Sequence, residues 1–305
     1  MVHLEVAAVP ECPTGGFLMR TEASGLCSGE LMSWYMDQKV PHVLGHEVAG
    51  IVVESDTPEF PVGCRVAPHH HAPCGHCEIC QSGHHVHCPT WKATRLDPGG
   101  LAEYIAVEAR LLVDCTRADD LNPRDAALIE PLACVMKGRR RARWTPSDRT
   151  AVIGLGVMGL LHMLSCPGAV GFELRKDRAD WAKNLGMTVS ESGEFDVIFV
   201  CPGSVAAMQR AVELAAPGAR IVAFAPFGPT ETALPRFNDL YFRDLELISS
   251  YSCGPTDTAE AAQLLRTGQV RADQVVSHEI SFDDLPSHYI KMRDEEILKP
   301  MVIFP

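Results

Sequence analysis

Four cysteines within fifteen residues constrain this chain most, and their spacing is C-x2-C-x2-C-x7-C. Thiolates spaced in this way can surround Zn²⁺ as a tetrahedron, because the short links fold one segment over the ion and the fourth cysteine loops back. Disulfides are the alternative, but the chain begins without the pattern of a signal peptide. A closed four-thiolate site stabilises a lobe and leaves no position for chemistry. We therefore predict a structural zinc held by Cys74, Cys77, Cys80 and Cys88.

The composition predicts a globular protein of two domains. The 305 residues exceed what one hydrophobic core usually supports, and 46% of them are hydrophobic and 22% charged. A net charge of −12 opposes binding to a phosphate backbone, so we expect no nucleic-acid partner. No apolar run reaches the length of a membrane span. We expect a cytoplasmic protein without a membrane partner.

The pattern along the chain changes near residue 150. The first 115 residues contain short β-branched runs between glycines and prolines, which predict a barrel-like β domain with strands at 48–53 and 101–107. From residue 150, strand and helix patterns alternate, as in a doubly wound parallel sheet. A helix at 257–265, a polar segment and a strand at 301–304 close the chain. In the alternating part we predict strands at 150–153, 169–173, 195–201, 219–225 and 245–251 and helices at 157–165, 177–185 and 205–215.

A glycine-rich turn, G-L-G-V-M-G, joins the first predicted strand and helix of this alternating part. The first glycine permits a tight turn, the second lets the backbone approach a pyrophosphate, and the third permits close packing of helix on strand. Amide groups at the helix start add a partial positive charge. The turn predicts a dinucleotide site whose residues are Gly154, Gly156, Val157, Met158 and Gly159.

Glu173 ends the next predicted strand, where a carboxylate can accept hydrogen bonds from both hydroxyls of an adenosine ribose. The alternative is a solvated carboxylate at a strand end. An acid at the ribose repels a 2′-phosphate and favours NAD, whereas Arg175 and Lys176 leave NADP as the alternative. We predict NAD, with Glu173 and Arg175 close to the ribose.

A second set of metal-ligating residues is spread over separate segments. His46 and Glu47 precede the predicted strand 48–53, Cys27 lies upstream, and Glu130 lies near the start of the nucleotide-binding part. A cysteine, a histidine and carboxylates from separate loops are what a catalytic zinc uses when it keeps a position open for substrate or water. Taken singly, each residue also suits an ordinary structural role.

These motifs together resemble those of the zinc-containing medium-chain dehydrogenase/reductase family, in its polyol and threonine dehydrogenase-like branch. They occur in the family's order and cover the first half of the chain and the start of the nucleotide-binding part. The resemblance rests on G-L-C-S-G-E at 25–30, G-H-E at 45–47, P-C-G-H-C-E-I-C…C at 73–88, G-G-L-A-E-Y at 99–104, A-L-I-E-P-L-A-C at 127–134 and V-I-G-L-G-V-M-G at 152–159.

The resemblance implies a GroES-like catalytic domain at 1–131, completed by 253–305, and interrupted by a Rossmann NAD(P)-binding domain at 132–252. It places the active site in the cleft between the domains. It also implies two zinc ions per chain, one structural and one catalytic.

By the same resemblance, Cys27 and His46 ligate the catalytic zinc, and Glu47 and Glu130 supply its carboxylate contacts. Lys299 resembles a basic residue that reaches the cofactor phosphates. Two departures concern the alcohol proton, because the family usually has a hydroxyl residue where this chain has Gly29 and often a histidine where it has Met32. The neighbouring Ser28, Glu47 or a zinc-bound water remain as acceptors of that proton.

The remaining histidines and cysteines carry no clear motif. We expect the histidines around the cysteine lobe to be solvated, and Trp91 either packs or lines a pocket. The histidines are His69, His70, His71, His76, His84, His85 and His87, and the cysteines read as core or surface residues are Cys12, Cys64, Cys115, Cys134, Cys166, Cys201 and Cys253.

The sequence therefore predicts a zinc-dependent oxidoreductase that transfers a hydride between a secondary alcohol, such as a polyol, a sugar-derived alcohol or an amino alcohol, and NAD. One alternative is a catalytically silent family member that binds zinc and nucleotide. Another is an NAD(P)H-dependent reductase of activated double bonds, which needs no catalytic zinc. We expect a homodimer or homotetramer with a small-molecule alcohol or ketone as its substrate.

Overall fold

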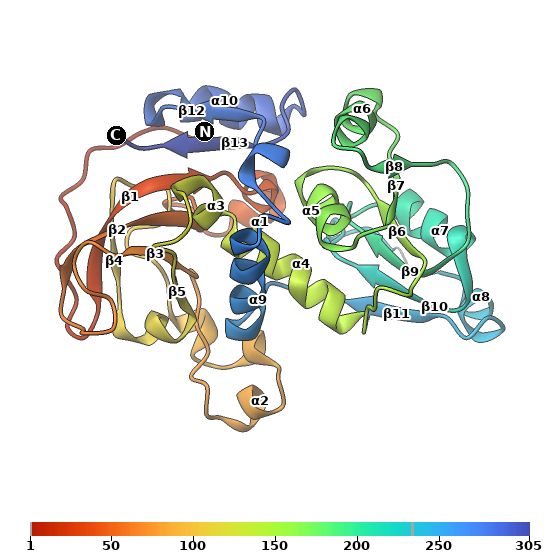
Figure 1. Ribbon diagram of the computed structural model, residues 1–305, viewed down its shortest axis with the longest axis horizontal. Helices are drawn as coiled ribbons and strands as arrows, with labels where there is room; N and C mark the ends of the chain where they lie inside the picture. The colour runs from red at the N-terminus through yellow and green to blue at the C-terminus, as the bar shows by residue number, and fades with distance from the viewer. Residues whose placement is uncertain (1, 233–234) are drawn as a thin grey trace. The chain divides into compact units, whose positions relative to one another are not determined.

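The computed structural model describes residues 2–232 and 235–305 and divides into two compact units (Figure 1). Unit 1 comprises Met1–Ala133 and Cys253–Pro305, and unit 2 comprises Cys134–Ser252. The chain therefore passes between the units twice, and the first passage lies within helix α4 (Ile129–Arg141). The sequence-based boundaries were 131/132 and 252/253.

Unit 1 is built on a seven-stranded sheet in the order β12-β13-β1-β2-β3-β5, with β4 paired to β1. The pairs of β1 with β2, β4 and β13 are antiparallel, and β12 and β13 are parallel. Its strands are β1 (Phe17–Gly25), β2 (Glu47–Ser55), β3 (Arg65–Pro68), β4 (Tyr104–Val107), β5 (Cys115–Arg117), β12 (His278–Ile280) and β13 (Pro300–Ile303).

The C-terminal segment completes this sheet. Strand β13 pairs with β1 from Ala23 opposite Ile303 to Gly25 opposite Met301. Helix α10 lies over β12 and β13 in Figure 1, and its Leu285 and Met292 belong to the same buried cluster as Val302. The helices of unit 1 are α1 (Ser33–Met36), α2 (Glu78–Gln81), α3 (Pro123–Ala127), α9 (Pro255–Arg266) and α10 (Leu285–Arg293), together with the start of α4.

Unit 2 contains a six-stranded parallel sheet in the order β11-β10-β9-β6-β7-β8. The strand order reverses between β6 and β9, as in a doubly wound sheet, and a ligand is expected at the carboxyl ends of the strands at that point. The elements are β6 (Thr150–Ile153), α5 (Val157–Ser165), β7 (Val170–Phe172), α6 (Lys176–Asn184), β8 (Thr188–Val189), β9 (Phe195–Val200), α7 (Val205–Leu214), β10 (Ala215–Ala223), α8 (Phe237–Tyr241) and β11 (Glu246–Ser249).

Local sequence explains these elements. All four residues of β6 are buried, as expected for a strand that is covered on both faces of a parallel sheet. Helix α5 ends close to Pro167 and Gly168, and Gly168 has a φ of +85°. Helix α9 begins with Pro255 at its first turn, and the Asp257 carboxylate accepts a hydrogen bond from the N–H of Gly254.

The predicted fold class, a GroES-like domain with an inserted Rossmann domain, is confirmed. One local prediction is wrong, because the segment interpreted as merely polar contains β12 and α10. Helix α10 buries only Leu285 and Met292, so its sequence shows little helical periodicity. Among the described residues, no helix is both long and apolar enough to cross a membrane.

Candidate functional site: two metal centres and a nucleotide turn

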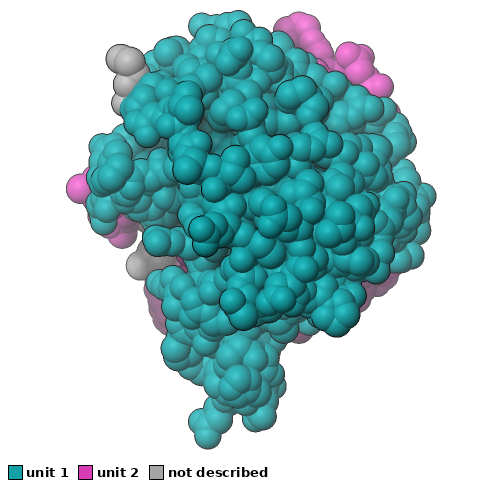
Figure 2. Space-filling model, turned by 90° about the vertical axis from the view of Figure 1, so that its left-hand side faces the viewer, with its two compact units in different colours: residues 1–133, 253–305 teal, residues 134–252 magenta. Residues whose placement is uncertain are grey.

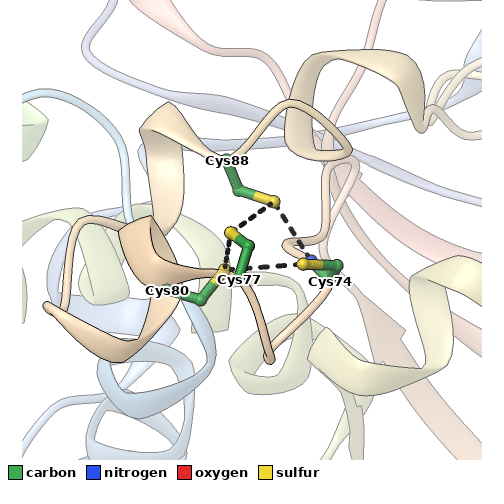
Figure 3. Close-up of side chains that lie close together, drawn as sticks. All are labelled: Cys74, Cys77, Cys80 and Cys88. Atoms are coloured by element: carbon green, nitrogen blue, oxygen red, sulfur yellow. Dashed lines mark hydrogen bonds between the residues drawn. The ribbon is translucent and has the colours of Figure 1, made fainter.

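The four predicted zinc cysteines point toward one another (Figure 3). The Sγ atom of Cys77 lies 3.5 Å from that of Cys80 and 3.9 Å from that of Cys88, and the Sγ atoms of Cys74 and Cys80 are 3.9 Å apart. Tetrahedral Zn²⁺ with Zn–S bonds of about 2.3 Å sets its sulfur atoms roughly 3.8 Å apart. The geometry therefore fits a structural zinc that these four thiolates would hold.

This lobe has a small core of its own. Val86 and Trp91 are buried against Cys80 and Cys88, so Trp91 is a packing residue of the lobe. Burial opposes ionisation of Cys88, yet hydrogen bonds from backbone N–H groups of Cys74 and Thr90 contribute to lowering its pKa to about 6. A thiol with such a pKa is readily available as thiolate. In Figure 2 the lower end of unit 1 narrows to a projecting knob, which is the α2 region of Figure 1.

Cys27, His46 and Glu47 form a second group, in which one ligand atom of each lies within 4.8 Å of the others. Cys27 is the N-cap of the 3₁₀ helix Ser28–Leu31, and Glu47 is the first residue of β2. Burial raises the pKa of Cys27, whereas the neighbouring His46 acts to lower it. Thiolate, imidazole and carboxylate are a donor set that suits Zn²⁺ with an open position.

Glu30 also belongs to this site, although no role was predicted for it. Its Oε1 accepts a hydrogen bond from the N–H of Gly45 at 2.6 Å and lies 3.3 Å from Nδ1 of His46. Burial opposes ionisation, but His46 and the backbone N–H groups hold the pKa of Glu30 below its usual value. A carboxylate at Nδ1 leaves Nε2 as the metal-binding nitrogen. The signal was present in G-L-C-S-G-E, where Glu30 stands at the third position after the capping Cys27.

Behind this group, Glu47 forms an ion pair with Lys299, whose ammonium also donates to the carbonyl of Leu26 at 3.2 Å. The side chains of Lys299 and Glu47 are only 1% and 2% exposed. The predicted contact of Lys299 with cofactor phosphates stays a prediction, since the structure places this lysine in the interior of unit 1.

Glu130 lies in a third group, with His69 and Cys253. Its predicted contact with the catalytic zinc therefore also stays a prediction. The expectation that the lobe histidines are solvated is wrong for His69, which is buried, and for His70 and His71, which are half-buried. No sequence motif singled out Cys253, because the three residues of this group are far apart in the sequence and come together only in the folded protein.

The glycine-rich turn follows β6 at the point where the strand order of unit 2 reverses. Gly154 has a φ of +83°, and a Cβ on Gly159 would collide with the carbonyl oxygen of Gly154. A Cβ on Gly156 would meet nothing nearer than Nη1 of Arg178 at 4.0 Å. Protein packing thus explains two of the glycines, and the open space at Gly156 fits the approach of a pyrophosphate.

The predicted ribose carboxylate lies beside this turn. Glu173 accepts hydrogen bonds from the backbone N–H groups of Leu155 at 2.7 Å and Arg175 at 2.8 Å. The guanidinium of Arg175 pairs with Asp177, and Lys176 pairs with Asp180. Arg178, on the first turns of α6, is the cation next to Gly156 and was not singled out from the sequence.

Comparison with known proteins identifies the family. Residues 13–117 match the alcohol dehydrogenase GroES-like domain. The chain is 30% identical over 313 residues to the D-altritol 5-dehydrogenase of Agrobacterium fabrum, covering 93% of this chain and 90% of that protein. The chain belongs to the zinc-containing medium-chain dehydrogenase/reductase family.

Other members of the family match over nearly their whole length. The L-threonine 3-dehydrogenase of Bacillus velezensis is 25% identical, with 98% of this chain and 94% of that protein covered. A crystal structure described as a zinc-binding dehydrogenase from Sinorhizobium meliloti, bound to NADP, has a TM-score of 0.87 at 25% identity, covering 97% and 94% of the two chains. Zinc and a nicotinamide cofactor are the cofactors of this family, and the four-thiolate site and the glycine turn fit them.

Replacing one lobe cysteine tests the structural zinc. Cys77→Ser should remove about one zinc per chain and yield insoluble protein or a melting temperature lower by roughly 10 °C, because a structural zinc contributes folding free energy directly. Zinc content and calorimetry provide the measurement, with Cys12→Ser as the control outside the lobe. Soluble Cys77→Ser protein with an unchanged melting temperature would contradict the assignment.

Two glycine substitutions separate folding from cofactor binding. Gly159→Ala should lower the melting temperature, because its Cβ has no room against Gly154. Gly156→Ala has room for its methyl group and should melt like the wild type, yet weaken NAD binding about tenfold or more, since the methyl group fills the space for the pyrophosphate. Scanning calorimetry measures the melting temperatures, and calorimetric titration with NAD measures the affinity of each variant for the cofactor. Equal NAD affinity in Gly156→Ala and wild type would place the cofactor elsewhere.

Glu30→Gln tests the orientation of His46. The loss of an outer carboxylate typically weakens metal binding by about 10–100-fold, so this variant should release the Cys27–His46–Glu47 zinc at lower chelator concentration and keep the lobe zinc. Its acid unfolding should also change. Because the folded-state pKa of Glu30 is below its ordinary 4.5, the carboxylate stabilises the fold above that pH, and the stabilisation is lost as the pH falls through the folded-state pKa. Glu103→Gln, an exposed change in the same unit, is the control, and equal metal retention in both variants would refute the role.

Proposed function

We propose that this protein oxidises a secondary alcohol with NAD and reduces the corresponding ketone with NADH. One observation carries the proposal, namely the thiolate–imidazole–carboxylate group of Cys27, His46 and Glu47 in the GroES-like unit of a family member. That donor set, oriented by a buried carboxylate, suits a zinc with an open position.

When bound, the zinc supplies Lewis acidity that lowers the pKa of an alcohol hydroxyl. Cys27 and His46 would hold it, and Glu30, 3.3 Å from Nδ1 of His46, would fix the imidazole. In alcohol oxidation the hydrogen on the carbinol carbon would leave as hydride, with the electron pair of the C–H bond, for the nicotinamide ring, and the O–H proton would leave to a base. We propose that this proton passes to solvent through Ser28, which is exposed directly after Cys27. Gly29 offers no hydroxyl, although a Cβ there would lie only 3.5 Å from the Cys27 sulfur.

We propose NAD over NADP as the preferred cofactor. The support is the carboxylate of Glu173 beside the turn, since it repels a 2′-phosphate. Each of the two cations that kept NADP as an alternative also pairs with a carboxylate, Arg175 with Asp177 and Lys176 with Asp180. The names of the relatives, which include dehydrogenases of D-altritol and L-threonine, support a polyol or an amino alcohol as the substrate class. We therefore propose a polyol, a sugar-derived alcohol or an amino alcohol as the substrate, and a cytoplasmic homodimer or homotetramer.

A catalytically silent protein that binds zinc and nucleotide is the second candidate, and Gly29 and Met32 in the proton path are what favour it. A reductase of activated double bonds needs no catalytic zinc, so removal of the Cys27–His46–Glu47 zinc separates it from an alcohol dehydrogenase.

Steady-state rates of NAD reduction on a panel of polyols, sugar-derived alcohols and amino alcohols test the proposal. Cys27→Ser and His46→Gln should lower turnover on the best substrate about a thousandfold or more, because the loss of metal activation removes several kcal/mol of transition-state stabilisation. Both variants should keep the lobe zinc and a melting temperature close to that of the control Cys12→Ser. Wild-type rates in His46→Gln would exclude zinc catalysis, and a wild type that binds zinc and NAD but oxidises no alcohol would establish the silent protein.

A further inference from the structure

Two permanently charged side chains, Lys39 and Arg95, lie near the predicted catalytic group, and the alcohol oxidation derived above does not use them. Lys39 belongs to the segment between α1 and β2, and Arg95 belongs to the segment that leads to β4. Both residues are exposed, so a ligand in solution can reach them. We refer to Lys39, Arg95 and the histidine that both influence, His42, as the basic rim.

Backbone hydrogen bonds hold these two segments side by side. The N–H groups of residues 100 and 101 donate to the carbonyl oxygens of residues 45 and 44, each at 2.8 Å. The segment that carries Arg95 therefore runs beside the segment that carries Lys39 and leads to His46.

A row of imidazole rings connects Arg95 to the predicted metal ligand. Nδ1 of His71 lies 2.6 Å from the carbonyl oxygen of Thr94, the residue before Arg95. The ring centroid of His70 is 4.3 Å from that of His71 and 4.7 Å from that of His46. Contacts thus run without a break from the backbone at Arg95 to the imidazole of the predicted catalytic group.

The charges of the rim lie close to one another and to that imidazole. Partial burial lowers the pKa of His42, and the positive charge of Lys39 lowers it further, with an effect in the same direction from Arg95. The same ring is also affected by Glu30 and by His46. Because the interaction between exposed charges fades over about 10 Å in ordinary buffer, these side chains are grouped around His42 at short range.

Neither cation of the rim forms an ion pair within residues 2–232 and 235–305. Nζ of Lys39 lies 3.8 Å from the centroid of the Tyr35 ring, a contact that holds the side chain without neutralising it. Asp37 and Asp97, the acidic residues of the same two segments, pair with neither Lys39 nor Arg95. By contrast, every other arginine of unit 1 forms an ion pair or donates to a backbone carbonyl.

Two unpaired cations beside a predicted metal site indicate an anionic ligand. The protein has a net charge of −12, so the rim is a local positive region on an acidic molecule. A guanidinium can bind a carboxylate or a phosphate through two parallel hydrogen bonds, and an ammonium adds a point charge. A neutral polyol gains little from two full charges, whereas an alcohol that carries an anionic group gains from both.

We infer that the alcohol oxidised by this protein carries an anionic group, a carboxylate or a phosphate, which Arg95 and Lys39 bind. In chemical terms the substrate is a sugar acid or a sugar alcohol phosphate. The inference rests on the proposed function, because it names the substrate class of that same site. It makes both residues determinants of specificity and gives them no part in the chemical step.

Matched sets of alcohols test the inference on the full-length protein purified with zinc. Each set shares one configuration and consists of a neutral hexitol, the hexonate and the hexitol phosphate, with sets for sorbitol, mannitol, galactitol and altritol. In the set that reacts best, kcat/KM for the better anion should exceed that for the neutral hexitol about tenfold or more. The anion with the larger kcat/KM shows whether a carboxylate or a phosphate is bound.

Removal of either charge should lower this preference. Arg95→Gln and Lys39→Gln should each reduce the ratio of the two kcat/KM values about tenfold, mainly through a higher KM for the anion, because the contact is made equally with substrate and transition state. Arg110→Gln, which removes an exposed arginine paired with Glu108, is the control and should keep the ratio. All three variants should melt like the wild type, since each changes an exposed side chain.

The outcomes separate this inference from the proposed function. If the neutral hexitol is oxidised as well as its anions, the inference is overturned, the two residues are solvated surface cations, and the proposed function stays intact. A preference for the anion that survives in both Arg95→Gln and Lys39→Gln also overturns the inference, because another group then binds the anion. A wild type that oxidises no alcohol of any set overturns the proposed function and this inference together.

Discussion

The buried ion pair of Glu47 and Lys299 is the interaction on which unit 1 depends. Both side chains are almost wholly buried, so neither charge is tolerable without the other, and removing one partner of such a pair typically costs about 3–5 kcal/mol. Glu47 begins β2, and Lys299 immediately precedes β13. Because β2 and β13 flank β1 in the sheet, the pair fastens the returning C-terminal segment to the loop that carries His46. The same contact that closes the sheet also fixes a carboxylate beside Cys27 and His46.

Carboxylates orient the histidines of unit 1 in a repeated manner. Glu30 lies at Nδ1 of His46, and Asp114 lies at Nδ1 of His69. In each case a thiol and a second carboxylate lie close to the imidazole. They are Cys27 and Glu47 in one group and Cys253 and Glu130 in the other. Such positioning is what allows a buried imidazole to act as a ligand, since ring orientation and tautomer are set before any ion arrives.

In unit 2 the constraint is electrostatic, because the protein has a net charge of −12 and the nicotinamide cofactor is an anion. The turn after β6 supplies backbone amides and open space at Gly156, and Arg178 adds a cation close by. Glu173 is held by two backbone N–H groups, so its charge is fixed at the edge of this site. Local dipoles and one guanidinium would favour phosphates at this turn, although the overall charge of the protein would repel them.

Short-range patterns in the sequence determined much of this protein. Three features each lie within one continuous segment, so that residue spacing predicts their geometry. They are the four lobe cysteines, the glycine turn and the strand predicted at 150–153. Resemblance placed Cys27, His46 and Glu47 together, but spacing alone could not. Only the tertiary structure brought His69, Glu130 and Cys253 together, gave Glu30 its contact with His46 and buried Lys299 against Glu47. The physical reason is that strand pairing and loop closure across the whole sheet bring distant segments together. Such contacts produce no periodic pattern in the local sequence.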